Sequence, residues 1–170
     1  MSKTRNIVII TILAFSFIFE GIFSNFISAY SFFSPLFVLM SLIIIYPFLI
    51  NNKETYYKCC FIIGLLYDII YTDTIIVHAF LFLIIGFIIT KINLVLANNH
   101  VNVIIMALII IILYRTILYC LLILTSNVDF NFWNFLQSIY LSLIVNIIYI
   151  VILNMITDKV SLKFKIYKGN

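Results

Sequence analysis

The chain has 170 residues, of which 65% are hydrophobic and only 9% are charged, and its formal net charge is +4. Soluble domains carry about 25% charged residues, and a fold of this size has too little interior to hide so much apolar surface. These values exclude a soluble globular protein and predict an all-α integral membrane protein. With only four Gly and two Pro there is no linker-like segment, so we expect residues 1–170 to form a single transmembrane domain.

Apolar runs separated by short polar breaks predict six transmembrane helices. In chain order these spans cover residues 6–23, 31–50, 56–71, 74–95, 101–124 and 132–156. Lys3 and Arg5 precede the first span as they would in a signal peptide, but the five spans that follow favour an uncleaved helix. Pro35 suits the start of the second span, whereas Pro47 is expected to kink or end it. The third span is only about 24 Å long and is therefore not expected to face lipid on all sides.

Basic residues are distributed unequally between the predicted loops. Nine of the ten Lys and Arg residues lie at the N-terminus, after the second and fourth spans, and in the C-terminal tail. The other three loops, at 24–30, 72–73 and 125–131, contain none. Because cytoplasmic segments of membrane proteins are enriched in Lys and Arg, this distribution predicts that both termini lie in the cytoplasm. An even number of spans agrees with that orientation.

Four ionisable side chains interrupt the apolar spans: Glu20, Asp68, His78 and Arg115. A charged group at membrane depth costs about 2.5–3.5 kcal/mol on insertion scales, so each of these residues needs an explanation. In the predicted topology the two acids and His78 lie about one turn from the outer ends of their spans. The long side chain of Arg115 can extend into the same half. We therefore predict that Arg115 pairs with Asp68 or Glu20 through two hydrogen bonds.

Three interpretations of this outer polar cluster are open. In the simplest, the ion pair only holds the helices in position. In the second, the cluster forms a pocket, open to the outside, that receives a ligand or a partner. The third is a proton relay, for which one His and two acids are few, since the inner half contains no acid. His78 alone is typical of a hydrogen-bonded packing residue, and Asn146 and Thr116 are expected to form hydrogen bonds between helices.

Glycine positions mark where helices can approach each other closely. Gly64 and Asp68 share one face of the third span with Phe61 and Tyr71, because their spacings are 3, 4 and 3. We expect this face to point into the bundle. Gly64, and Gly86 on the fourth span, are predicted to let a neighbouring backbone come close.

Signatures of soluble enzymes are missing from the sequence. It contains no glycine-rich phosphate loop, no HExxH and no GxSxG, and the loops are too short for a catalytic domain. Cys59, Cys60 and Cys120 lack the spacing of a metal or redox site. We therefore predict no enzymatic activity, no cofactor, no metal site and no nucleic-acid partner; the partner that composition implies is the lipid bilayer.

One stretch resembles a known family. Gly64-Leu65-Leu66-Tyr67-Asp68, a short outer turn, and the helix from His78 through Gly86 to Lys91 are similar to the bacterial rod shape-determining protein family MreD. That family typically shows a GLxxD element followed by a Gly-bearing apolar helix that ends in a basic residue. Pro35-Leu36 resembles the proline that opens the family's second span. The chain departs from the pattern at Tyr71-Thr72-Asp73-Thr74, where a glycine is expected in the turn.

The resemblance implies a non-enzymatic component of the cell-wall elongation (rod shape) machinery, or elongasome, in the bacterial cell membrane. Such a protein binds MreC and helps control cell shape and lateral peptidoglycan synthesis. Its indirect partners are MreB, a SEDS-type glycosyltransferase and a penicillin-binding transpeptidase. The implied fold is similar to the substrate-binding subunit of energy-coupling-factor transporters. On that analogy, a remnant pocket or the seat of the MreC helix is formed by Glu20, Gly64, Asp68, His78, Gly86 and Arg115.

Two alternatives to this function come from other classes. The chain could be the substrate-capture subunit of an energy-coupling-factor vitamin transporter, binding a vitamin in the same outer pocket. Such subunits often carry an AxxxA pattern on the first span, whereas Ala14 stands alone here. A membrane enzyme acting on lipid-linked precursors is the third possibility.

Overall fold

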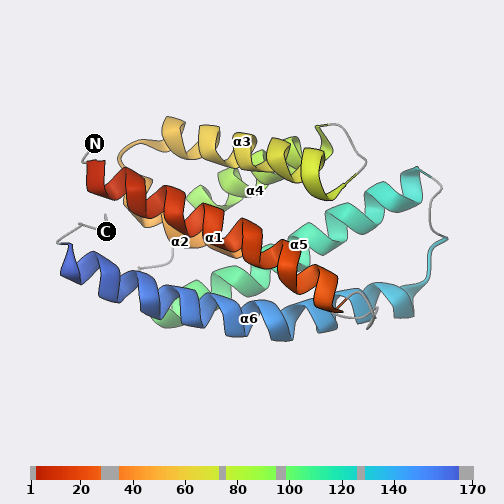
Figure 1. Ribbon diagram of the computed structural model, residues 1–170. Helices are drawn as coiled ribbons and strands as arrows, with labels where there is room; N and C mark the ends of the chain where they lie inside the picture. Colours follow the sequence, from red (N-terminus) through yellow and green to blue (C-terminus); the bar gives the residue numbers. More distant parts are fainter. Residues whose placement is uncertain (1–2, 28–34, 73–75, 95–98, 126–128, 165–170) are drawn as a thin grey trace.

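Figure 1 shows the computed structural model, which describes residues 3–27, 35–72, 76–94, 99–125 and 129–164. These residues form helices and no strands, as predicted. Three of the helices are long and apolar enough to cross a membrane, namely α1, α5 and α6. The six helices are α1 (Lys3–Ile27), α2 (Phe37–Leu49), α3 (Lys53–Tyr71), α4 (Val77–Ile92), α5 (His100–Leu124) and α6 (Phe132–Lys163).

The helix boundaries differ from the predicted spans mainly at α2. This helix begins at Phe37, so Pro35 lies before it, and it continues past Pro47 to Leu49. In contrast, α1 and α6 are longer than predicted, and α3 begins at Lys53 and has 19 residues. Parts of the predicted spans, at 31–34, 74–75 and 95, lie outside the described residues, as do two of the tail lysines, Lys165 and Lys168.

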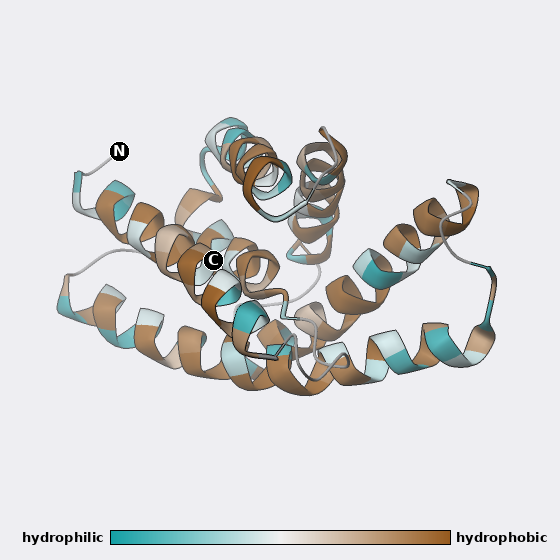
Figure 2. Ribbon diagram, turned by 45° about the vertical axis from the view of Figure 1, so that its right-hand side comes forward, coloured by the Kyte–Doolittle hydropathy of each residue, from teal (hydrophilic) through white to brown (hydrophobic). Residues whose placement is uncertain are grey.

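The helices pack as two antiparallel pairs, α3 with α4 and α5 with α6, and α1 lies along α2. The first and last helices begin and end on the same side of the molecule (Figure 1). On the opposite side, the end of α5 and the start of α6 extend past the other helices in both views (Figure 2). Figure 2 also shows that hydrophobic residues cover most of every helix. We call this extension, residues 116–125 and 129–141, the α5–α6 arm.

Helix α2 lies at the centre of the bundle. It packs against all five other helices, and all of its residues except Pro47 are buried. An apolar residue faces nearly every direction around its axis, which is the pattern of a helix surrounded by protein. With 13 residues it is about 20 Å long, well short of the ~30 Å hydrocarbon layer. Its ends are therefore inside or near the edge of the bundle.

The α3–α4 pair is built around glycine, as predicted for Gly64. A Cβ atom at Gly64 would lie 2.6 Å from the Ala79 Cα and from the His78 carbonyl oxygen, so the two backbones are in direct contact. At Gly86 the neighbour is a side chain instead, because a Cβ there would lie 2.7 Å from the Cys60 Sγ. Gly86 thus makes room for a cysteine and not for a backbone.

The residue before α4 has an unfavourable conformation. Ile76 has φ 68°, in the left-handed region, and is the only described non-glycine residue with a positive φ. A β-branched side chain is disfavoured there, and glycine is the usual occupant. This residue follows the turn in which the family resemblance led us to expect a glycine.

We predict that Ile76→Gly costs less stability than a glycine placed inside a helix. Relief of the left-handed penalty, about 1–2 kcal/mol, offsets the extra chain entropy of glycine in the unfolded state, about 0.5–1 kcal/mol. The side chain is 41% exposed, so the loss of its remaining contacts takes up part of that gain. Thermal unfolding of the detergent-solubilised protein, followed by circular dichroism, tests this. Ile70→Gly, at a 59% exposed position inside α3, is the control and should lower stability by roughly 1 kcal/mol; equal losses for both variants would contradict the prediction.

Candidate functional site

Two polar side chains from distant helices meet the start of α2. The first backbone N–H groups of a helix have no partner within it, and the residue that precedes α2, Leu36, provides no side-chain cap. Instead, Glu20 on α1 accepts a hydrogen bond from the Val38 N–H at 2.8 Å. Asn146 on α6 accepts one from the Leu36 N–H at 2.7 Å. A carboxylate at this end of the helix is also favoured by the helix dipole.

The second oxygen of the Glu20 carboxylate binds α3. It accepts a hydrogen bond from the Tyr67 hydroxyl at 2.8 Å, so one buried carboxylate joins α1, α2 and α3. Aromatic rings pack beside it: Phe37 stacks on Tyr149 with ring centroids 4.1 Å apart, and on Phe19 at 5.3 Å. Glu20 is thereby shielded from lipid and is only 3% exposed.

Arg115 belongs to the Asn146 side of this network. The Asn146 amide nitrogen lies 3.0 Å from the Ser142 Oγ, and the Arg115 Nη2 donates to the same oxygen at 3.2 Å. Hydrogen bonds therefore run from α5 through α6 to the start of α2.

The predicted direct ion pair between Arg115 and an acid is wrong. Among the described residues, Lys58 pairs with Glu54, and the His78–Asp68 and His100–Asp158 contacts are ion pairs only when the histidine is protonated. The physical reason is that each buried carboxylate receives hydrogen bonds from backbone amides at a helix start. These donors are fixed in place by the helix, whereas the Arg115 side chain contacts α6.

Asp68 does for α4 what Glu20 does for α2. One carboxylate oxygen accepts the His78 N–H at 3.1 Å and lies 2.8 Å from the His78 Nδ1, and the other accepts the Ala79 N–H at 3.1 Å. The residue before α4, Ile76, provides no side-chain cap. Gly64, one turn before Asp68 on α3, lets the start of α4 come close enough for these bonds. The prediction that His78 is a hydrogen-bonded packing residue is confirmed.

The structure divides the six predicted site residues into separate groups. Gly64, Asp68 and His78 meet where α3 contacts the start of α4, while Glu20 and Arg115 lie around the start of α2. Gly86 packs on Cys60. Five of the six are buried and Arg115 is partly buried. Four of the cavities in the described part of the chain are lined by other side chains. This arrangement favours the interpretation in which the polar groups hold helices in position.

Other polar residues divide between interhelical and local bonds. Asn146 forms the predicted bond between helices. The Thr116 hydroxyl donates instead to the Ile112 carbonyl of its own helix, so the prediction for Thr116 is wrong.

Sequence reasoning missed Tyr67 and Ser142 as partners of the buried polar residues. A signal was available: Leu36 cannot cap a helix, so a helix starting beside it inside a bundle needs acceptors from elsewhere. Within the described residues, no group of three or more His, Cys, Asp or Glu side chains could hold a metal ion.

We predict that Asp68→Ala lowers stability by roughly 2–4 kcal/mol, because two backbone N–H groups and the His78 ring lose their acceptor. Asp68→Asn keeps one acceptor oxygen and should fall between this variant and the parent. Thermal unfolding in detergent measures both. Glu54→Ala, which removes an exposed ion pair with Lys58, should hardly change the melting temperature. A loss for Asp68→Ala as small as that of Glu54→Ala would refute the capping role.

We also predict strong coupling between Glu20 and Tyr67. In a double-mutant cycle of Glu20→Ala and Tyr67→Phe, the destabilisations should deviate from additivity by about 0.5–3 kcal/mol, since the residues share a buried hydrogen bond. Tyr119→Phe is the control partner. Its hydroxyl bonds the Asn131 backbone, so Glu20→Ala and Tyr119→Phe should add within about 0.5 kcal/mol. Additive effects in the first cycle would show that Glu20 and Tyr67 do not act together.

Comparison with known proteins identifies a family. The family described as rod shape-determining protein MreD matches residues 1–160 of the chain. Neither the curated proteins nor the solved structures gave a match. The matched region includes all the residues that carried the resemblance seen in the sequence, from Pro35 to Lys91. Because the match covers well over half of the 170 residues, the chain belongs to the MreD family of rod shape-determining proteins.

Proposed function

We propose that this chain is a non-enzymatic scaffold of the machinery that builds the lateral cell wall, located in the bacterial cell membrane. In this role it binds MreC and helps control cell shape and peptidoglycan synthesis. Through MreC it acts with MreB, a SEDS-type glycosyltransferase and a penicillin-binding transpeptidase. The family match over residues 1–160 is the observation that carries the proposal.

The buried polar network supports a scaffold over an enzyme. Glu20 and Asp68, the acids at membrane depth, accept hydrogen bonds from backbone amides of α2 and α4. Their role in this arrangement is to complete helix starts that lie in the bundle. A protein whose polar side chains are used in this way presents a fixed surface to its partners.

We propose six membrane crossings with both termini in the cytoplasm. The distribution of Lys and Arg supports this topology, as do the first and last helices, which begin and end on the same side (Figure 1). On this topology α2 and α4, which are shorter apolar helices, cross within the bundle. The α5–α6 arm then lies toward the outer face, as do the polar residues Glu20, Asp68, His78 and Arg115.

We propose the α5–α6 arm as the seat of the membrane helix of MreC. The six residues first considered for this role are mostly buried, so a partner cannot contact them while the bundle is closed. On the arm, Trp133, Leu136 and Tyr140 are exposed and line a groove of about 450 Å³ together with Gln137. Helices associate in membranes through close packing and interhelical hydrogen bonds, and the groove offers both an apolar lining and the Gln137 amide.

Co-purification with MreC, followed by cysteine crosslinking, tests the proposal. In a background with Cys59, Cys60 and Cys120 replaced by Ala, the variants are Trp133→Cys, Leu136→Cys and Tyr140→Cys. Each is paired with cysteines placed along the membrane helix of MreC. Ile22→Cys and Phe26→Cys on α1, exposed apolar positions toward the same side of the bundle, are the controls. We expect crosslinks at the arm with the periodicity of a helix and few at α1.

Two contrary outcomes are distinguishable. Crosslinks at α1 and not at the arm would place MreC elsewhere while keeping the function. A failure of MreC to co-purify, together with a failure of the chain to restore rod shape in cells that lack their own family member, would overturn the function itself.

A further inference from the structure

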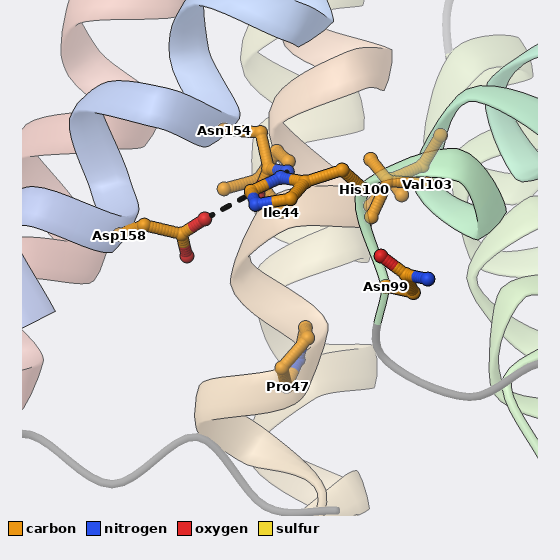
Figure 3. Close-up of a pocket in the computed structure, with 8 residues that line it drawn as sticks. Ile44, Pro47, Asn99, His100, Val103, Asn154 and Asp158 are labelled. Atoms are coloured by element: carbon orange, nitrogen blue, oxygen red, sulfur yellow. Dashed lines mark hydrogen bonds and ion pairs between the residues drawn. The ribbon is translucent and has the colours of Figure 1, made fainter.

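A polar cavity lies between α2, α5 and α6 (Figure 3), on the side of the molecule where α1 begins and α6 ends (Figure 1). It measures about 200 Å³, far more than the ~30 Å³ that one water molecule occupies in the liquid. Figure 3 shows the His100 side chain extending from the start of α5 toward Asn154 and Asp158 of α6, with Pro47 of α2 at the edge of the cavity. Asn99 also lines the cavity. None of these residues belongs to the network at the start of α2.

The cavity is rich in hydrogen-bond acceptors. The His100 Nδ1 lies 2.8 Å from the Asn154 amide nitrogen and 3.6 Å from the Asp158 Oδ2. Because the Asn154 amide donates to the His100 Nδ1, that nitrogen is not a donor to Asp158. A carboxylate has about four lone-pair sites, so Asp158 can accept a hydrogen bond from a ligand besides those of its present partners. Ile43 of α2 also lines the cavity. Because Pro47, four residues later, has no N–H, the Ile43 carbonyl lacks its usual helical donor. A carboxylate and a backbone carbonyl around one cavity favour a ligand that is positively charged and donates hydrogen bonds.

An apolar groove continues from this cavity. It measures about 270 Å³, shares His100, Val103 and Asn154 with the polar cavity, and is otherwise lined by Ile104, Ile150, Val151 and Met155. Met155 is 54% exposed, on a helix apolar enough to cross a membrane, so the groove opens toward lipid. A polar cavity joined to an apolar groove fits a molecule with a polar head and a hydrocarbon chain.

We propose that this joined site binds a phospholipid with a primary amine headgroup, such as phosphatidylethanolamine. The ammonium group occupies the polar cavity against Asp158 and the Ile43 carbonyl, and one acyl chain lies in the apolar groove. An anionic lipid without an amine fits less well, because the Asp158 carboxylate repels its phosphate. A basic protein segment does not account for the apolar groove. The site is independent of MreC binding.

Native mass spectrometry of the full-length protein in detergent tests the site. Dioctanoyl phosphatidylethanolamine is titrated in, and dioctanoyl phosphatidylglycerol serves as the matched lipid without an amine. We expect one ethanolamine lipid to be retained with an affinity about tenfold higher than the glycerol lipid, since a charged hydrogen-bonded contact distinguishes them. Equal affinity for the two lipids, or binding of neither, would overturn the proposal.

Two variants approach the site from its two ends. Asp158→Asn should remove about tenfold in affinity for the ethanolamine lipid and little for the glycerol lipid. Val151→Trp should fill the groove and weaken binding of both lipids. The controls are Asp129→Asn, an exposed acid at the far end of α6, and Ile148→Trp, an exposed apolar position outside the groove; both should bind like the parent.

Size-exclusion elution and helical circular dichroism report whether each variant folds. If Asp158→Asn does not fold, the comparison of the two lipids on the parent protein still tests the headgroup, and Val151→Trp still tests the groove. Unchanged binding in every folded site variant would refute the proposal. The proposal would also be refuted if the parent protein binds a basic peptide and not the lipid, and free ethanolamine displaces that peptide.

Discussion

Backbone amides at the starts of α2 and α4 impose the main constraint on this structure. In a protein surrounded by lipid, no water is present to accept hydrogen bonds from an exposed N–H, and neither helix start has a capping side chain of its own. Glu20 and Asn146 supply the acceptors for α2, and Asp68 supplies them for α4. The buried acids Glu20 and Asp68 are therefore explained by backbone donors, joined by the Tyr67 hydroxyl and the His78 ring, and Arg115 is not needed as their direct partner.

This constraint also explains how a helix of 13 residues can occupy the centre of the bundle. Because α2 packs on all five other helices, its apolar side chains are buried in every direction, and its first turn must be satisfied by side chains from its neighbours. The long helices α1 and α6 supply these side chains. The short helix and the polar residues of its neighbours thus require each other.

Much of the fold could be predicted from the sequence. The composition indicates how much apolar surface must be kept from water, and the spacing of residues indicates which of them share a helix face. The close approach at Gly64 and the hydrogen-bonded role of His78 followed from these patterns. The pairing of Arg115 did not, because charges alone suggest ion pairs and do not reveal unfilled backbone donors. The central place of α2 was also missed, although its uniformly apolar run is typical of a surrounded helix. Thr116 bonded within its own helix, an option that spacing cannot separate from an interhelical bond.

The hydrogen bond between the Leu36 N–H and Asn146 links positions 110 residues apart. At ordinary rates of translation, roughly ten seconds separate the synthesis of the two residues. Throughout that interval the start of α2 has been made but its acceptor from α6 has not. The hydrogen bonds at the start of α2 are therefore complete only after this part of α6 has been synthesised, so the centre of the bundle depends on a helix that is made long after it.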